Sequence, residues 1–275
     1  MRRGVLSALL LFALAVPLAA QPLFLTNLGP QLPGSDFSRW HSEQVRGFAT
    51  FGHVQCDAMA GDSGQTVWDN GNPAFSASGS KNWPTKPVVL KDGSVAAELV
   101  TRRVVGVIAS GNLFTGRIQR ELSLAQLLGF TDDGKKLIDW GTPFTARPKG
   151  IRVKMAYEGL GDSCTVMATL ENRSGGSRRY VATAWYSSPN DSDMTREGVR
   201  SISARDSNGL RTVELYFVYG RLHKGADPLP DGVEQGAAGE PVTHVNVVFA
   251  SSRRGDHFEG TKGARLVVKD FEFLY

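Results

Sequence analysis

Apolar and polar residues alternate with a period of two along much of this 275-residue chain. In the stretch GIRVKMAY, Ile151, Val153 and Met155 alternate with Arg152 and Lys154. Successive side chains of a strand point to opposite faces of a sheet, so this pattern predicts a half-buried β-strand. The same holds for SVAAELVT, VVGVIAS, RRYVATAWY, TVELYFVY, HVNVVFA and RLVVKDFEFLY. A chain patterned in this way is expected to fold as β-sheet.

Helical periodicity is confined to one short piece, LSLAQLLGF at residues 122–130. About ten short strands joined by Gly-, Asp- and Asn-rich turns predict an all-β fold, a two-sheet sandwich or a barrel. Strands do not alternate with long helices, which argues against a Rossmann or TIM architecture. Residues 224–241, KGADPLPDGVEQGAAGEP, are expected to form a long loop between strands.

The first twenty residues have the features of a secretory signal peptide. Arg2 and Arg3 precede an apolar stretch at residues 5–16, and Ala19-Ala20 supplies the small residues of a cleavage site. A retained transmembrane anchor needs about 20 apolar residues, more than this stretch provides.

We therefore expect a leader at residues 1–20 cleaved near Ala20, an N-terminal extension at 21–34 and one domain at 35–275. No membrane span is expected after cleavage, and the mature protein is predicted to be secreted, periplasmic or part of the cell envelope.

Charge gives no reason to expect nucleic acid as a partner. Without Arg2 and Arg3, 29 basic residues face 27 acidic ones, so the mature chain is close to neutral despite a pI near 9.1. Export implies an oxidising compartment, in which Cys56 and Cys164 could form a disulfide or remain as buried thiols; both interpretations stay open.

Catalytic motifs do not hold up in context. GDSG at residues 61–64 resembles the loop around a nucleophilic serine, but Ser63 lies too near the leader for a protease of that type. The five histidines lack zinc-site spacing, and NDSD at 190–193 lacks the later glycine and glutamate of a calcium loop. No motif indicates a cofactor. Paired carboxylates for glycoside hydrolysis could come from several aspartates, none of which the spacing selects: Asp132, Asp133, Asp139, Asp162 and Asp256.

The tryptophans give the strongest hint of a ligand. All five lie near turn-forming residues: Trp40, Trp68, Trp83, Trp140 and Trp185. Exposed aromatic rings stack on the C–H faces of sugars, while amides and charged groups bind sugar hydroxyls. VWDNGN and SKNWPT fit this chemistry, so Trp68, Asn72 and Trp83 are the first candidates for a sugar site. The alternative is that these rings fill the ends of a sandwich.

The stretch GNLFTG at residues 111–116 brackets two large apolar residues with glycines. Glycine is used where the backbone needs a positive φ or a close approach. We interpret the stretch as a structural corner, with Leu113 and Phe114 buried in the core beneath it.

Several motifs in order resemble the putative carbohydrate metabolism domain of Bacteroidetes exported proteins. They cover roughly residues 35–275 and are SDFSRW, VWDNGN, AAELVT, ASGNLFTG, GTPFTARPKGIRVKMAY, GDSCTVMATL and VNVVFASSRRGDHFEGTKGARLVVKDFEFLY. The resemblance implies a jelly-roll-like β-sandwich similar to carbohydrate-binding modules and a role in glycan handling, without an established catalytic mechanism.

The resemblance also bears on individual residues. Ser38 and Lys269 stand where the family usually has carboxylates, and of these carboxylates only Asp270 remains, so we expect no calcium site. Arg253, Asp256 and His257 in SSRRGDHFEG are second-choice polar ligand contacts. Arg147 is expected to pair with a carboxylate or carbonyl inside the fold.

The sequence therefore predicts an exported, non-catalytic glycan-binding or glycan-metabolism accessory protein. Two other functions remain: a glycoside hydrolase with an unidentified carboxylate pair, and a structural envelope protein that binds a protein partner through an apolar patch.

Overall fold

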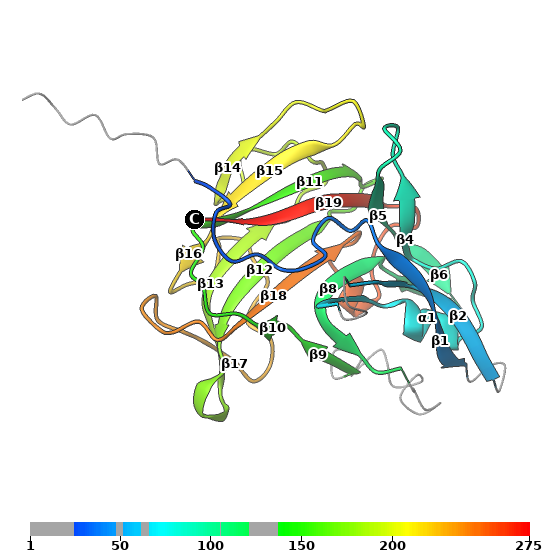
Figure 1. Cartoon of the computed structure of the whole chain (residues 1–275), viewed down its shortest axis with the longest axis horizontal. Coiled ribbons are helices and arrows are strands. Elements are labelled where there is room, and N and C mark those ends of the chain that lie inside the picture. The colour runs from blue at the N-terminus through cyan, green and yellow to red at the C-terminus, as the bar shows by residue number, and fades with distance from the viewer. Residues whose placement is uncertain (1–24, 48–51, 62–65, 105, 121–136) are drawn as a thin grey trace, which may run out of the picture.

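Two sheets of mainly antiparallel strands, packed face to face, make up most of the molecule (Figure 1). This computed structural model describes residues 25–47, 52–61, 66–104, 106–120 and 137–275. The expected leader, the helix-like piece at 122–130 and Ser63 lie outside these residues. The prediction of an all-β sandwich is confirmed.

The first sheet has six strands in the order β14-β15-β11-β19-β5-β4. They are β4 (Thr85–Val89), β5 (Val95–Val100), β11 (Gly150–Glu158), β14 (Val199–Ile202), β15 (Arg211–Tyr216) and β19 (Arg265–Leu274).

The second sheet has nine strands, of which six follow the order β16-β13-β12-β18-β8-β3 and three attach beside this path. They are β3 (Trp68–Asn70), β8 (Asn112–Ile118), β9 (Ile138–Trp140), β10 (Thr142–Pro143), β12 (Thr165–Asn172), β13 (Arg178–Tyr186), β16 (Val218–Tyr219), β17 (Val233–Gln235) and β18 (His244–Ala250).

Eight of these strands have jelly-roll connectivity. In chain order they are β5, β8, β11, β12, β13, β15, β18 and β19. Numbered one to eight, they form the sheet orders 1-8-3-6 and 2-7-4-5, and every pairing is antiparallel. The first strand thus lies beside the last, and the chain wraps twice around the barrel-like core.

Three smaller elements lie beside the sandwich. β1 (Trp40–Gly47) and β2 (Gly52–Met59) form a two-stranded ribbon next to α1 (Asn72–Ala77), a helix too short for a periodic signal in the sequence.

VVGVIAS does not form the single strand that its composition predicts. Gly106, with φ of 85°, turns the chain between β6 (Arg102–Val104) and β7 (Val107–Ala109).

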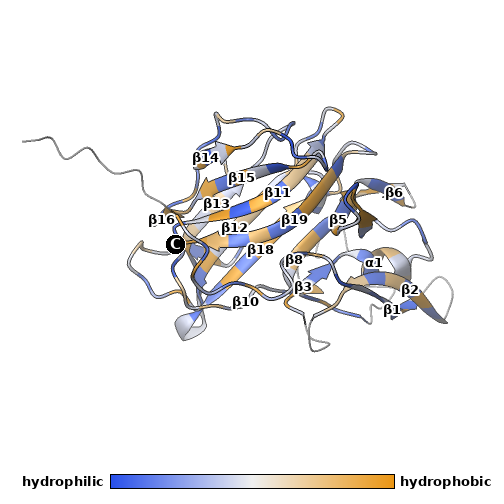
Figure 2. Ribbon diagram, turned by 45° about the horizontal axis from the view of Figure 1, so that its top comes forward, coloured by the Kyte–Doolittle hydropathy of each residue, from blue (hydrophilic) through white to orange (hydrophobic). Residues whose placement is uncertain are grey.

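The apolar members of the alternating pattern fill the space between the two sheets, and hydrophobic and hydrophilic residues alternate along several strands in Figure 2. Ile151, Val153 and Met155 are all fully buried there, which confirms the predicted strand. Cys164 also points inward, but Cys56 and Cys164 are free thiols. Burial raises the pKa of both thiols to about 12, which favours the protonated form over the reactive thiolate.

GNLFTG forms the start of β8 and not a turn. Leu113 faces the core between the sheets, whereas Phe114 belongs to a separate cluster on the opposite face of β8. Both side chains are buried, as expected, but on opposite sides because neighbouring strand residues alternate. A Cβ on Gly111 would lie 2.4 Å from the amide nitrogen of Val100, so this glycine permits a close backbone approach.

The segment before residue 35 is bound to the end of β19. Thr26 and Tyr275 exchange two backbone hydrogen bonds, of 3.2 and 2.7 Å. The side-chain amide of Gln31 binds the backbone of Phe273. The amide oxygen accepts from the Phe273 N–H at 2.7 Å, and the amide nitrogen donates to the Phe273 carbonyl at 3.0 Å. Leu32 is buried in the main core. The predicted extension therefore binds along the part of β19 that does not pair with β5.

Replacing Gln31 with alanine is expected to lower the free energy of unfolding by about 1–2 kcal/mol, because both backbone groups of Phe273 lose their partner. Urea unfolding of the variant measures this loss. The matched change Gln44→Ala, at an exposed position of β1, should have almost no effect. Equal stability of the two variants would show that the Gln31 amide does not hold the segment in place.

Candidate functional site

Trp68 is part of the core, which corrects its assignment as a sugar platform. Its ring is 0% exposed and packs against Phe37, Phe249 and Phe271, with centroids 4.9, 6.1 and 5.8 Å away. The indole N–H donates to the carbonyl of Pro33 at 3.1 Å. No face of this ring is available to a ligand.

Asn72 is also structural. Its amide nitrogen donates to the carbonyls of Asp57 at 2.8 Å and Thr85 at 2.6 Å, and its Oδ1 accepts from the N–H of Thr85. These bonds tie β2, α1 and β4 together and use both ends of the amide. The side chain of Asn72 thus binds backbone groups and is not directed at sugar hydroxyls.

The other predicted site residues do not converge on one place. Trp83 is half-buried before β4, with a buried indole N–H that has no partner among the described residues. Asp256 and His257 are exposed in the short 3-10 helix Gly255–His257, and Arg253 precedes it. Arg147 donates to the carbonyls of Ala238 and Glu240 and lies 4.8 Å from the ring centroid of Tyr219, so its expected carbonyl partners are confirmed, although at the surface.

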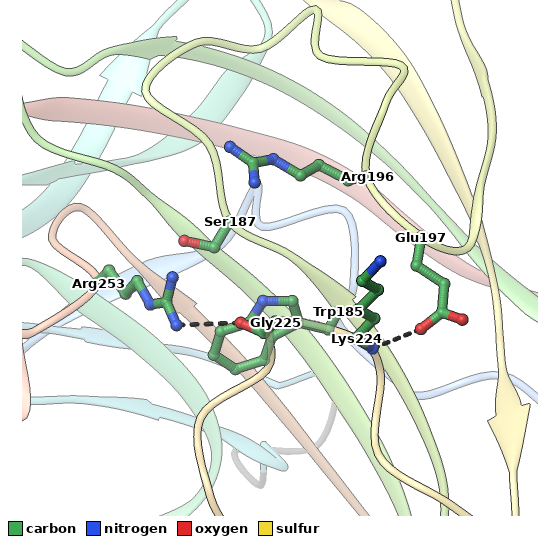
Figure 3. A pocket seen from close by; sticks show the side chains of 7 residues that line it. All are labelled: Trp185, Ser187, Arg196, Glu197, Lys224, Gly225 and Arg253. Atoms are coloured by element: carbon green, nitrogen blue, oxygen red, sulfur yellow. Dashed lines mark hydrogen bonds between the residues drawn. The ribbon is translucent and has the colours of Figure 1, made fainter.

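A small pocket forms on the outer face of the nine-stranded sheet, next to Trp185 (Figure 3). Ala184 and Tyr186 of β13 are fully buried, so the residue between them points away from the core. The Trp185 ring is half-buried, and the guanidinium of Arg253 lies 5.7 Å from its centroid. Arg253 is held there by the carbonyl of Gly225 at 3.0 Å and by Asp227 at 2.8 Å.

Loops far apart in the sequence complete this pocket. It is lined by Trp185, Ser187, Arg196, Glu197, Lys224, Gly225 and Arg253 and has a volume of about 30 Å³. Of the six residues predicted for a ligand site, Arg253 is the one that lines it.

Glu197 is a fixed anion in the wall of the pocket. Hydrogen bonds from Arg221 and from the backbone N–H of Lys224 lower its pKa to about 2. The neighbouring His223 ring donates from Nε2 to the carbonyl of Thr183 at 2.7 Å, and burial lowers its pKa. Its Nδ1 lies 3.9 Å from Glu197, but a neutral ring makes no ion pair at this distance.

Ser187 presents an unused hydroxyl to the pocket. Its Oγ is buried and has no hydrogen-bond partner among the described residues. Buried polar groups are almost always paired, so an unpaired hydroxyl in a pocket wall indicates a position where a ligand or water binds. Together with the ring of Trp185, it gives the pocket one stacking surface and one hydrogen-bonding group.

A larger depression of about 570 Å³ lies beside the N-terminal segment, on the six-stranded sheet. Four of its six charged groups pair with one another: Arg152 with Glu272 at 3.1 Å, and Lys154 with Asp270 at 3.2 Å. It has no tryptophan in its lining. We therefore prefer the smaller pocket, although its volume admits only part of a ligand.

Within the described residues, no group of histidine, cysteine, aspartate and glutamate side chains could hold a metal ion. No helix of that part of the chain has the length and hydrophobicity to cross a membrane.

The sequence contains one signal for this pocket, although the alternation along the strand does not by itself identify a site. In YVATAWYSS, Thr183, Trp185 and Ser187 share a phase opposite to the buried Ala184 and Tyr186. A tryptophan in the outward phase of a strand, among small polar residues, is expected to be accessible. The contributions of Arg196, Glu197 and Lys224 depend on loop positions that the alternation does not encode.

Comparison with known proteins gives a fold. No family model matches the sequence, and no curated protein matches it. The crystal structure of a "putative glycoside hydrolase" from Bacteroides thetaiotaomicron superposes with a TM-score of 0.56 at 19% identity, over 91% of this chain and 72% of that one. A second "putative glycoside hydrolase", from Bacteroides vulgatus, gives 0.56 and 19% over 85% and 94%.

A family 11 carbohydrate-binding module of a Clostridium thermocellum cellulase aligns at 12% identity over 89% and 94%, with a TM-score of 0.33. That score is too low to support any conclusion. The two Bacteroides proteins share the fold of this chain.

Proposed function

We propose that this protein is an exported glycan-binding accessory protein of the bacterial cell envelope and a member of the putative carbohydrate metabolism domain family. The observation that carries the proposal is the half-exposed ring of Trp185 beside Arg253 and the unpaired hydroxyl of Ser187. An aromatic face next to polar donors is the combination that sugars require. The leader-like N-terminus supports export, and the two structural relatives carry names from glycan chemistry.

Replacing Trp185 with alanine is expected to weaken glycan binding about 10- to 30-fold, because the stacking surface is removed. A glycan array followed by calorimetric titration of the best ligand measures this change. The matched variant is Trp83→Ala, which removes the other partly exposed ring considered above. Loss of binding in the Trp83 variant alone would place the site near β4, and absence of binding to every glycan would refute the proposal.

Glycoside hydrolysis is the second candidate, because the pocket contains the carboxylate of Glu197. A hydrolase needs two carboxylates about 5–10 Å apart, one of which acts as an acid with a raised pKa. Glu197 has a lowered pKa and suits the other role, and the pocket lining contains no second carboxylate. Release of reducing sugar that stops in Glu197→Gln would favour the hydrolase.

An apolar docking face, expected for a structural protein with a protein partner, is not favoured. Among the described residues, the large hydrophobic side chains with high exposure are dispersed over separate segments: Leu28, Val89, Leu160 and Met194.

A further inference from the structure

The charges of the Trp185 pocket indicate which class of glycan it would take; this inference rests on the proposed function. The lining contains three cationic side chains, Arg196, Lys224 and Arg253, and one carboxylate, Glu197. Two of the cations already have carboxylate partners: Arg196 pairs with Asp193 at 2.7 Å, and Arg253 pairs with Asp227 at 2.8 Å.

Glu197 does not neutralise the remaining cation. Its two oxygens accept hydrogen bonds from the guanidinium of Arg221, at 2.6 and 3.2 Å. The contact between Glu197 and Lys224 involves the backbone N–H of the lysine and not its side chain. Within the described parts of the chain, no carboxylate pairs with the ammonium group of Lys224. The pocket therefore has one unmatched positive charge.

The volume of the pocket restricts what can enter it. About one water molecule fits in every 10–15 Å³ of such space, so 30 Å³ holds two waters or one small substituent. A carboxylate or sulfate group is of this order of size, whereas a pyranose ring is not. The ring of a bound sugar would have to lie outside, against Trp185, with its substituent directed inward.

We infer that this pocket binds the anionic substituent of an acidic saccharide. The ammonium of Lys224 holds the anion, and Trp185 supports the sugar ring. Arg196 and Arg253 stay paired with their own aspartates and strengthen the positive potential at the entrance. A neutral sugar would leave the Lys224 charge without a partner.

The test uses the mature protein and four probes: an oligogalacturonate, its methyl ester, a sulfated galactan oligosaccharide and a neutral galactan oligosaccharide. The inference predicts tighter binding of the carboxylated or sulfated probe than of the uncharged ones, with an affinity that falls as salt is added. Comparison of the two acidic probes shows which anion is preferred. Equal or tighter binding of the uncharged probes overturns the inference but keeps the proposed function.

Substitution separates a specific site from general attraction of polyanions. Lys224 is exposed, so Lys224→Gln should leave the fold intact and weaken binding of the acidic probe about five- to tenfold, with little change for the neutral one. Lys91→Gln, in the turn between β4 and β5, is the matched control and should bind like the unmodified protein. Equal losses in both variants would refute a specific role for Lys224. Failure of all four probes to bind would count against the proposed function itself.

Discussion

Replacing Phe114 with alanine is expected to lower the free energy of unfolding by about 3–5 kcal/mol, as truncation of a core aromatic does. The side chain is 1% exposed and lies in the cluster that also contains Ile118 and Leu137. Its ring centroid is 5.0 Å from that of Trp140 on β9. The cavity would be bounded by rigid strands, β3, β8 and β18, that cannot close around it.

Equilibrium unfolding in urea, followed by tryptophan fluorescence and far-UV circular dichroism, would measure the loss. Val89→Ala removes apolar atoms at a position that is 69% exposed, so it should change stability by less than about 0.5 kcal/mol. A loss below about 1 kcal/mol for Phe114→Ala would mean that this cluster does not support the sheet and that GNLFTG should be reconsidered as a ligand-binding segment.

Replacing Glu171 with alanine should cost a similar amount, about 3–5 kcal/mol, because it removes the buried carboxylate that two partly buried arginines share. The carboxylate is 0% exposed at the end of β12. It accepts hydrogen bonds from Arg173 at 2.8 Å, from Arg178 at 2.8 and 2.9 Å, and from the hydroxyl of Thr169 at 3.0 Å. Burial acts to raise its pKa, but the two arginines lower it on balance.

The sign of the pH effect follows from this lowered pKa. Above about pH 4.5, the ordinary pKa of a glutamate side chain, Glu171 is ionised in both the folded and the unfolded state and its contribution to stability is complete. As the pH falls from there through the lower pKa of the folded state, that contribution is lost. Unfolding curves at several pH values should therefore converge for the unmodified protein and Glu171→Ala as the solution becomes acidic. The exposed change Glu234→Ala is the control; a gap that stays constant down to low pH would contradict the ion-pair explanation.

Strands were predicted correctly where each face of the strand keeps the same kind of surroundings, apolar or polar, along its whole length. Ile151, Val153 and Met155 meet the opposite sheet along the whole of β11, so one side is always apolar and the period of two is clear. It failed for VVGVIAS, where Gly106 interrupts an otherwise uniform apolar run, and for α1, which has six residues and no room for a repeat. In β8 the period is hidden, because Leu113 and Phe114 are both buried, one on each face.

Less of the candidate site than of the fold could be predicted from the sequence. The prediction of a sugar site rested on aromatic rings near polar turn residues, but the ring of Trp68 meets phenylalanines from segments before and after it. Of the predicted ligand residues, Arg253 lines the pocket beside Trp185, and its role in binding stays a prediction. Lys224 and Glu197 could not be selected, since each is brought there by a loop whose course depends on contacts with other loops.

By itself, the sequence determined that this chain folds as β-sheet, because the alternation of side chains is a local property of the backbone and is encoded residue by residue. It also determined that Leu113 and Phe114 are buried, because large apolar side chains beside a glycine that permits close backbone approach are favoured in the protein interior. The outward phase of Trp185 can be read from its strand, but the covering of Trp68 was decided by the tertiary structure. Exposure depends on what packs over a ring, and for Trp68 and Trp185 those residues come from positions up to about two hundred residues away, such as Phe271 for Trp68.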